Sequence, residues 1–289
     1  MKQLYVAIND LSTLNKLNKE MVSGVIVNSA SFSSGLSSHE LSDILDAFNT
    51  TDFKCIIRLD RLYNEEEIEE IKERLKQLAD NGIYGVLCTD LAVKVIVEEM
   101  KLDLKVIYAP ETLLTNYLDI QELRNEGFDH CVISKDIPLN DAYEIINQVP
   151  DYCWLRIHGP ILLSYSLRRF VSSYLEKPDN EPGLYELQES TREDRLPFIE
   201  KKEGSWLYGT CLESFSEFNK LQELPVAGLL IDNAFMNDEN TLKVLELYEK
   251  VYKDPLFAPE ALKELTEYDE TVEYSSLREI KKTILEKER

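Results

Sequence analysis

The stretch that decides the class of fold reads Cys153-Trp-Leu-Arg-Ile-His158-Gly159-Pro160-Ile-Leu-Leu-Ser-Tyr-Ser-Leu-Arg-Arg169. A short apolar and aromatic run over 152–157 stops at His158, and helix-permissive sequence follows Pro160 at once. Glycine allows the backbone to approach a neighbour closely, and proline suits the first turn of a helix. The pattern predicts a strand with His158 at its carboxyl end and a helix over 163–175. In α/β folds, binding and chemistry occur at that end of the strands.

Outward from this stretch, apolar runs of strand length alternate with helical segments along the whole chain. Most of the runs are continuously apolar, as in strands that are covered on both faces. The eight predicted strands cover 4–8, 24–27, 54–59, 85–88, 105–108, 130–133, 152–157 and 228–231. The predicted helices cover 11–20, 40–48, 65–81, 91–99, 116–126, 140–148, 163–175 and 213–224. Strict alternation predicts parallel strands with right-handed crossovers, and eight units favour an α/β fold of the (β/α)8 TIM-like barrel type.

Two regions depart from this alternation. Residues 177–210 form an excursion between the seventh and eighth strands, with a β-hairpin whose turn falls at 202–204. Its apolar side chains, Trp206 and Phe198 among them, predict either a lid over the barrel or an interface with another subunit. Residues 253–289 are highly charged, with one predicted helix at 276–287, and we expect this tail to be loosely attached. We therefore expect a barrel over 1–252 that includes the excursion, followed by the tail.

Composition limits the possible settings and partners. The formal net charge is −22 and 44% of the residues are hydrophobic. Such a charge repels phosphate backbones at long range, so we do not expect the chain to bind nucleic acids unaided and non-specifically. No apolar run has the length of a membrane span and no signal-peptide pattern opens the chain, so we expect a cytoplasmic protein without membrane association. The five cysteines are scattered, mostly in apolar runs, and are expected to be buried free thiols.

Polar residues at the predicted strand ends form the candidate site, because a barrel brings those ends together. The strand-end residues are Asn28, Arg58, Asp60, Asp90, Glu111, Ser134, Asp136, His158 and Asp232. Any one of the acids could instead cap the following helix or hydrogen-bond the backbone of a loop. His158 is the catalytic candidate as an acid or base, although it could also only fix the turn after its strand. The candidate substrate-binding residues are Arg156, Gly159, Tyr165, Arg168, Arg169, Glu111, Asp60, Asp90 and Asp136.

The segment from His158 to Arg169 resembles the signature of the collagenase-like peptidase family U32, His-Gly-Ala-x-Cys-x-x-Tyr-Ser-Gly-x-Cys. His158-Gly159 and Tyr165-Ser166 match, whereas Leu162 and Arg169 occupy the cysteine positions. The segment Tyr108 to Thr112, with Asn116, and the segment Val132 to Leu139 are also similar to the family. The resemblance spans roughly residues 1–250 and implies a barrel-like fold.

Members of this family hydroxylate RNA bases or ubiquinone precursors, and several hold an iron–sulfur cluster with four cysteines. Because Leu162 and Arg169 replace two of these cysteines, only Cys211 could remain of such a set, and one thiolate cannot hold a cluster. The resemblance therefore implies a protein without an iron–sulfur cluster or other metal. Arg169 places a cation where the family has a ligand, and this cation could bind a carboxylate or phosphate.

The resemblance also suggests a function. In many Gram-positive bacteria a shorter and a longer member are associated with hydroxylation of the tRNA wobble uridine, and this chain resembles the shorter one. We therefore expect a cluster-free bacterial subunit that joins a longer paralogue and reaches tRNA through the complex. One alternative is a collagenase-like peptidase, although neither H-E-x-x-H nor G-x-S-x-G occurs. Another is a stand-alone enzyme that binds a small organic acid through Arg156, Arg168 or Arg169.

Overall fold

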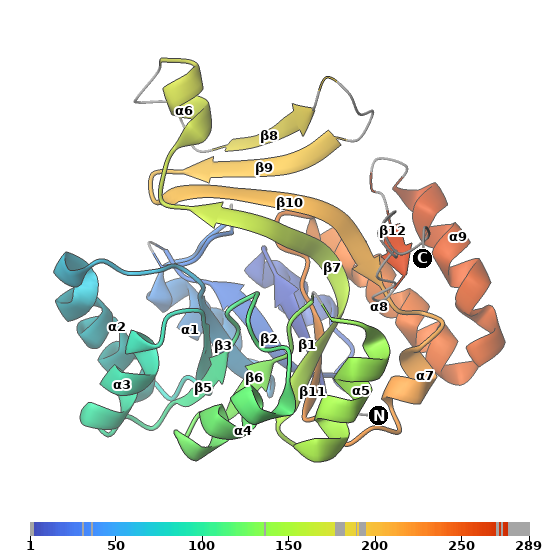
Figure 1. The fold of residues 1–289 in the computed structure, drawn as a ribbon, viewed down its shortest axis with the longest axis horizontal. Helices are drawn as coiled ribbons and strands as arrows, with labels where there is room; N and C mark the ends of the chain where they lie inside the picture. The colour runs from blue at the N-terminus through green and yellow to red at the C-terminus, as the bar shows by residue number, and fades with distance from the viewer. Residues whose placement is uncertain are drawn as a thin grey trace, which may run out of the picture.

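The fold is an eight-stranded parallel barrel, as the alternation of strands and helices predicts. The computed structural model describes residues 3–30, 32–35, 37–135, 137–176, 183–188, 190, 195–269, 272 and 274–276. The barrel strands are β1 (Leu4–Ile8), β2 (Val22–Asn28), β3 (Lys54–Leu59), β4 (Gly85–Cys88), β5 (Lys105–Tyr108), β6 (His130–Val132), β7 (Cys153–Ser166) and β11 (Gly228–Ile231). They pair in chain order, and β11 pairs with both β1 and β7, which closes the barrel (Figure 1).

Helices surround the barrel on its outer side (Figure 1). They are α1 (Leu41–Phe48), α2 (Ile68–Asp80), α3 (Ala92–Glu99), α4 (Tyr117–Asn125), α5 (Leu139–Gln148), α7 (Phe218–Leu221) and α8 (Asp238–Lys253). A 3₁₀ helix, η1 (Leu11–Lys16), replaces the first predicted helix, and η2 (Glu65–Glu67) precedes α2. The amphipathic spacing explains the packing of α2, because Ile71, Leu75 and Leu78 share one buried face.

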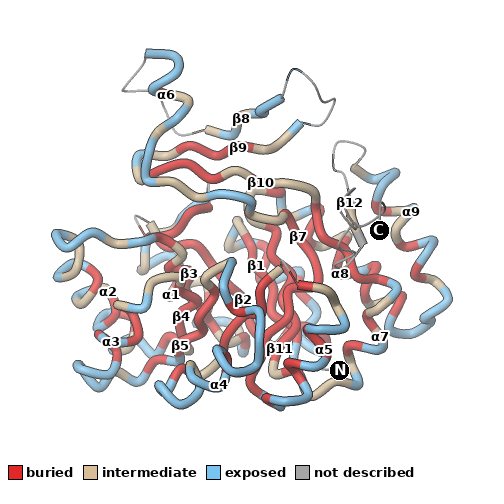
Figure 2. Tube along the Cα trace, in the orientation of Figure 1, coloured by how far each residue is buried: buried red, intermediate tan, exposed pale blue. Residues whose placement is uncertain are grey.

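Two layers of apolar side chains form the core. One layer lies between the strands and the surrounding helices. The other fills the barrel interior and includes Ile26, Ile56 and Ile107. There the rings of Tyr5 and Trp154 stack with centroids 3.8 Å apart. Figure 2 shows the buried strands at the centre of the molecule. The barrel is therefore filled by side chains, and its open end lies at the carboxyl ends of the strands.

The sequence predicts that the seventh strand ends at Ile157. In the structure, β7 continues through Gly159 and Pro160 to Ser166. Beyond the barrel it pairs antiparallel with β10 (Gly204–Glu213), and the sheet extends through β9 (Arg195–Lys201) to β8 (Gly183–Gln188). The helix predicted over 163–175 is wrong except for α6 (Phe170–Tyr174). The pairing partner of this segment lies some forty residues away, so local sequence does not reveal the strand.

The excursion is therefore longer than its predicted range and includes the second half of β7. Its hairpin turn lies between Lys201 and Gly204, as predicted. Because β10 extends to Glu213, the helix predicted over 213–224 shrinks to α7. We call β8, β9, β10 and the part of β7 from Pro160 to Ser166 the excursion sheet. This sheet lies over the open end of the barrel (Figure 1).

The first part of the charged tail is firmly packed, contrary to expectation. After η3 (Pro255–Phe257), α9 (Ala258–Tyr268) packs against α8. Its buried residues Ala258, Ala261 and Leu265 follow a helical spacing. The prediction missed this helix because it relied on the high overall charge of the tail. Strand β12 (Tyr274–Ser276) then pairs with β10. The helix predicted at 276–287 lies almost wholly outside the described residues.

In the part of the chain that the structure describes, no helix combines the length and the apolar character that a membrane span requires.

Candidate functional site

A cavity of about 180 Å³ lies at the open end of the barrel, beneath the excursion sheet. We call it the mouth cavity. Its floor consists of charged side chains from the strand ends, and its roof comes from β7 and β10. The lining includes Ser34, Arg58, Asp60, Thr89, Glu111, Lys135, Arg156, Pro160, Leu162, Tyr165, Trp206, Tyr208, Asp232 and Ala234. Strand-end residues that are far apart in the sequence therefore meet here.

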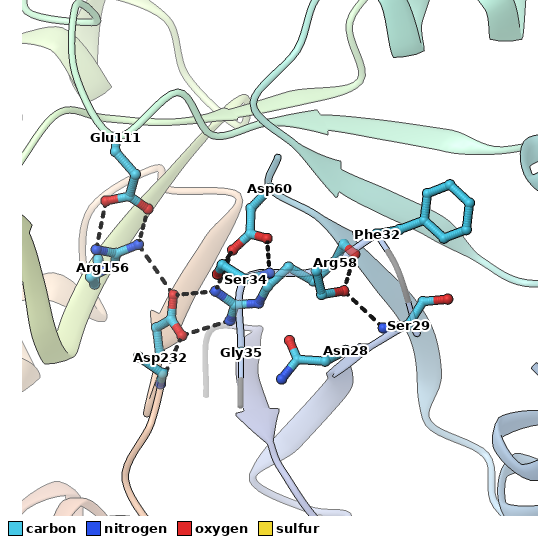
Figure 3. A network of polar contacts seen from close by, with 12 residues as sticks. Asn28, Ser29, Phe32, Ser34, Gly35, Arg58, Asp60, Glu111, Arg156 and Asp232 are labelled. Atoms are coloured by element: carbon cyan, nitrogen blue, oxygen red, sulfur yellow. Dashed lines mark hydrogen bonds and ion pairs between the residues drawn. The ribbon is translucent and has the colours of Figure 1, made fainter. Parts of the chain in front are cut away.

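Two arginines and two acids form a buried network on the floor of the mouth cavity (Figure 3). Arg58 of β3 donates two hydrogen bonds to Asp232, at 3.2 and 2.6 Å. Arg156 of β7 donates to Glu111 from both terminal nitrogens, one at 2.9 Å, and also reaches Asp232 at 3.2 Å. Asp232, which follows β11, thus joins the two guanidinium groups. Both bidentate pairs have the geometry in which arginine binds carboxylates most strongly.

Asp60 connects this network to the loop after β2. Its carboxylate accepts a hydrogen bond from the Ser34 amide at 2.7 Å and another from the Ser34 hydroxyl, and it lies 3.5 Å from Arg58. The neighbouring Ser33 hydroxyl donates to the Arg58 carbonyl at 2.6 Å. From the excursion sheet, Lys201 donates to the Ser33 carbonyl at 3.2 Å. The loop therefore ties the floor of the cavity to its roof.

Asp232, Arg58 and Arg156 keep their charges near neutral pH. Burial opposes ionisation of Asp232, but Arg58 and Arg156 outweigh it and lower the pKa of the carboxyl to about 2. Burial likewise disfavours the charged form of Arg58, yet Asp232 and Asp60 raise the pKa of its guanidinium above the ordinary value. The pKa of Arg156 is raised in the same way, by Glu111 and Asp232 against the effect of burial. Asp232, Arg58 and Arg156 are therefore all ionised.

Aromatic side chains of the excursion sheet form the roof. Tyr165 and Trp206 stack with centroids 4.9 Å apart, and Tyr208 contacts Phe235 edge to face. Trp206 and Phe198 are both buried, whereas they were candidates for an exposed interface. Alternation along β10 turns Trp206 and Tyr208 toward the barrel, so this part of the excursion covers the cavity like a lid.

His158 does not lie at a strand end, and its side chain is not in the mouth cavity. The pairing of β7 with β11 shifts register at this point, where Leu230 is opposite Arg156 but Ile231 is opposite His158. Such a bulge turns a side chain to the other face of the strand. His158 is 2% exposed and packs against Phe215 and Tyr248 on the helix side of the barrel.

The surroundings of His158 are those of a structural residue. Its Nδ1 lies 3.4 Å from the Tyr248 hydroxyl, and its Nε2 lies 3.9 Å from Cys211 Sγ. Burial lowers the pKa of the imidazole to about 3, and burial raises the pKa of the Cys211 thiol above its ordinary value. Because a reactive cysteine needs a lowered pKa and access to substrate, this pair is unlike the cysteine–histidine pair of a peptidase.

Gly159 has the close backbone approach that the sequence predicts. Its φ angle is +124°, and a Cβ atom built on it would lie 1.7 Å from the Asp232 carbonyl oxygen. Only glycine fits such a position. Gly159 therefore lets β7 cross tightly over the end of β11, where Asp232 enters the network.

Some of the other predicted site residues line the mouth cavity and some lie elsewhere. Glu111, Asp60, Arg156 and Tyr165 line the mouth cavity. Asp90 does not line it and accepts hydrogen bonds from the amides of Ala92 and Tyr63 at 2.9 and 3.1 Å. Asp90 thus holds the backbone at the start of α3 and in the loop at Tyr63, which is the alternative role that the sequence left open. Arg168 is exposed, Arg169 donates to Ser172 at 3.0 Å and lies 3.9 Å from Glu200, and Asp136 lies outside the described residues.

Several lining residues were missed. Arg58 and Asp232 were noticed as strand-end residues but were not assigned a role, although they form the centre of the network. Thr89 and Lys135 also follow strands, so their positions could have indicated them. Trp206 and Tyr208 could not have been found in this way, because only the pairing of β10 with β7 brings them over the cavity.

The cysteines do not form a ligand set for an iron–sulfur cluster. All five are free and buried, and they lie on β3, β4, β6, β7 and β10. Of the motif positions, Leu162 lines the mouth cavity and Arg169 is engaged with Ser172. Within the described ranges, no three His, Cys, Asp or Glu side chains are grouped so that they could hold a metal ion. The residues present therefore do not fit such a cluster, and its absence from the purified protein stays a prediction.

Fold and site together define a (β/α)8 barrel protein with a charged and roofed cavity at the carboxyl ends of its strands. In a comparison with known protein families, the sequence pattern of peptidase family U32 matches residues 5–288. The chain belongs to this family, as its His158-Gly159 motif suggested.

The chain is also similar to curated proteins of the family at low identity. It is 21% identical over 209 residues to tRNA hydroxylation protein P2 of Bacillus subtilis (strain 168), covering 68% of this chain and 67% of that protein. It is 19% identical to protein P1 of the same strain, covering 65% of this chain, and 24% identical to tRNA hydroxylation protein P of Escherichia coli (strain K12), covering 45%. The matches span 47% of P1 and 30% of the Escherichia coli protein, so this chain matches only part of these relatives.

Among solved structures, the chain is similar to 2,3-dimethylmalate lyase, a member of the PEP mutase/isocitrate lyase superfamily. The TM-score is 0.46 at 12% identity, and the match covers 93% of each chain.

Proposed function

We propose that this protein takes part in hydroxylation of the tRNA wobble uridine, as a cluster-free subunit of a complex. The observation that carries the proposal is the similarity to tRNA hydroxylation protein P2, which extends over about two thirds of both chains. The similarity to P1 and to the Escherichia coli protein supports the same process. The mouth cavity supplies a site of suitable polarity, with hydrogen-bond donors and acceptors under an aromatic roof.

The proposed partner is a longer and less acidic member of the same family. A net charge of −22 disfavours association between two copies of this chain. The excursion carries the apolar surface that an interface needs: Leu163, Leu167, Phe170, Tyr174, Leu175, Leu184 and Leu187 are large hydrophobic residues that are exposed. Figure 2 shows that α6 and β8 are the exposed part of the excursion, whereas β9 and β10 are largely buried. tRNA would then bind through the complex rather than to this chain alone.

The two alternative functions have weaker support. A peptidase needs an activated nucleophile or a metal-bound water, and the buried pair of His158 and Cys211 provides neither. A stand-alone enzyme for a small organic acid needs a cation to bind the carboxylate. The guanidinium of Arg156 is already paired with Glu111 and Asp232, and Arg169 contacts Ser172 and Glu200.

The test of the function is mass spectrometry of tRNA nucleosides from a strain that lacks this protein. We expect the 5-hydroxyuridine-type modifications to fall and to return when the gene for the unaltered chain is restored. Unchanged modification in the deletion strain would remove the proposal.

The partner is tested by co-purification with the longer family member from the same organism. Changing Tyr174 and Leu184 to serine on the excursion should abolish co-purification, since both side chains are exposed there. The matched control changes Tyr268 and Leu256 to serine, which are similarly exposed on α9 and η3. If the excursion variant still co-purifies, or if the unaltered chain purifies alone, the excursion acts only as a lid.

A further inference from the structure

The charged floor of the mouth cavity is covered by its roof. Arg58, Arg156 and Asp232 on the floor are 7%, 5% and 4% exposed, and Trp206 in the roof is 1% exposed. With the roof in this position, the three floor side chains therefore present almost no surface to solvent. A molecule that is to contact them needs the roof to move, because a closely packed interior does not admit it otherwise. Use of the floor therefore requires an open position of the excursion sheet.

The strand pairing that attaches the excursion sheet to the barrel is irregular at one point. The pairing of β7 with β10 shifts register between Leu207 and Tyr208, and again between Tyr208 and Cys211. On the barrel side of this point the two strands are held in place, because β7 also pairs with β11 and β10 also pairs with β12. Bulges of this kind interrupt the hydrogen-bonded ladder and let the strands bend. The excursion sheet can therefore bend at this point while its base stays fixed.

A lysine holds the opposite end of the sheet. Lys201 is the last residue of β9, at the turn into β10, whereas the irregular pairing lies toward the other end of β10. Its ammonium group donates to the Ser33 carbonyl at 3.2 Å and to the Gly35 carbonyl. Both carbonyls belong to the loop after β2, whose Ser34 is bonded to Asp60 on the floor (Figure 3). Lys201 thus connects the roof to the floor.

Two opposing effects act on the ammonium group of Lys201. Hydrogen bonds from a charged donor are stronger than those from a neutral one, so both carbonyls stabilise the closed position. Burial, however, disfavours the charged form and lowers the pKa of Lys201. When the sheet opens, water replaces the two carbonyls and the cost of burying the charge disappears. The closed position is therefore favoured without being locked, as a switch between two positions requires.

We infer that the outer part of the excursion sheet is a lid, which bends open at the irregular pairing of β7 with β10, and that Lys201 is its latch. When the latch releases, Tyr165 and Trp206 move away from the floor and the charged network becomes accessible. The inference concerns access to the mouth cavity and holds for any small molecule that enters it. The role of this opening in tRNA modification rests on the proposed function.

Acrylamide quenching of tryptophan fluorescence in the purified full chain tests the latch. Of the two tryptophans, Trp154 lies in the barrel interior and Trp206 on the inner face of the lid. Lys201→Met removes the ammonium group and keeps an apolar stem, so we expect the quenching constant to rise at least twofold. The matched control Lys202→Met changes the exposed neighbouring lysine and should leave quenching unchanged. In a Trp206→Phe background, Lys201→Met should have no effect.

Equal quenching of the unaltered protein and folded Lys201→Met would overturn the inference. An equal increase in Lys202→Met, or an increase that persists in the Trp206→Phe background, would do the same. Circular dichroism checks the folding of each variant, and Lys201→Gln, with the same expected increase, replaces Lys201→Met if the latter does not fold.

The outcomes for the latch and for the proposed function are separable. Increased quenching in Lys201→Met, together with normal tRNA modification in the deletion strain, would refute the proposed function and leave the latch standing. Unchanged quenching, together with lost modification in that strain, would do the reverse.

Discussion

At the scale of single residues, His158 and Gly159 are neighbours in the family motif but have different tasks. The backbone of Gly159 passes so close to the Asp232 carbonyl that no Cβ fits, while His158 fills a pocket between β7 and α8. The glycine could be predicted from sequence, because a glycine before a proline at a strand end indicates an unusual backbone. The face of β7 on which His158 lies could not be predicted, because the spacing of apolar residues does not indicate the bulge at Ile157.

Gly159→Ala should destabilise the protein severely, by more than about 3 kcal/mol, because the added methyl group meets backbone. The matched control is Gly82→Ala, where φ is +71° but no atom lies within 4 Å of the place that the added methyl group would occupy. That change should cost only about 1 kcal/mol of backbone strain. Denaturant unfolding of both variants measures the difference, and equal losses would contradict the close crossing of β7 over β11.

His158→Ala tests the buried state of the imidazole through pH. At pH 7 the variant should be less stable than the unaltered protein by about 2–4 kcal/mol, because a cavity replaces the ring. The pKa of His158 is about 3 in the folded protein and 6.5 in the unfolded chain. Between these two pH values, only the unfolded chain binds a proton at this imidazole. The contribution of the neutral His158 ring to the free energy of unfolding therefore falls as the pH drops from 6.5 toward 3.

The difference in free energy of unfolding between the unaltered protein and His158→Ala should therefore narrow below pH 6.5, by up to about 1.4 kcal/mol per pH unit. Urea unfolding at pH 7.0, 6.0 and 5.0 measures it. A gap that stays constant or widens would mean that His158 is accessible to protons in the folded protein.

At the scale of elements, the eight barrel strands and the hairpin of the excursion were predictable, whereas the second half of β7 was not. Continuous apolar runs such as Gly228–Ile231 are sufficient to identify buried parallel strands. The second half of β7 reads as a helix start, and only its pairing with β10 makes it a strand. From the sequence, Trp206 could belong to a lid or to an interface, and the pairing places it over the mouth cavity. The acids and arginines of the floor were easier to find, because strand ends in a barrel always converge.

Glu200 attaches α6 to the excursion sheet. Its buried carboxylate accepts hydrogen bonds from the amides of Val171 and Ser172, at 2.6 and 2.9 Å. Burial raises the pKa of Glu200, but the hydrogen bonds from Ser172 and Val171 outweigh it and lower the pKa below the ordinary value. Glu200→Gln should weaken these charge-assisted bonds, so hydrogen exchange of both amides should accelerate at least tenfold. The control Glu186→Gln, on exposed β8, should leave them unchanged; equal protection in both variants would refute the anchoring role.

At the scale of the whole molecule, the charges are separated in a way that bears on function. The chain carries a net charge of −22, yet the mouth cavity balances three cations with three carboxylates. Part of the exposed apolar surface lies on the excursion, next to that cavity. An acidic barrel with a neutral site and an apolar edge suits a subunit that works beside a partner, since the chain alone repels an RNA backbone. The overall charge was readable from the sequence, but this local balance required the fold.

The central claim is that the mouth cavity serves tRNA hydroxylation. The most direct test restores the deletion strain with Glu111→Gln, which removes one carboxylate from the cavity while Arg156 keeps its contact with Asp232 at 3.2 Å. The hydroxylated uridine content of tRNA is measured by mass spectrometry, beside the unaltered chain and at equal protein level. We predict that the unaltered chain restores the modification and that Glu111→Gln lowers it at least tenfold. Full restoration by Glu111→Gln would contradict the claim.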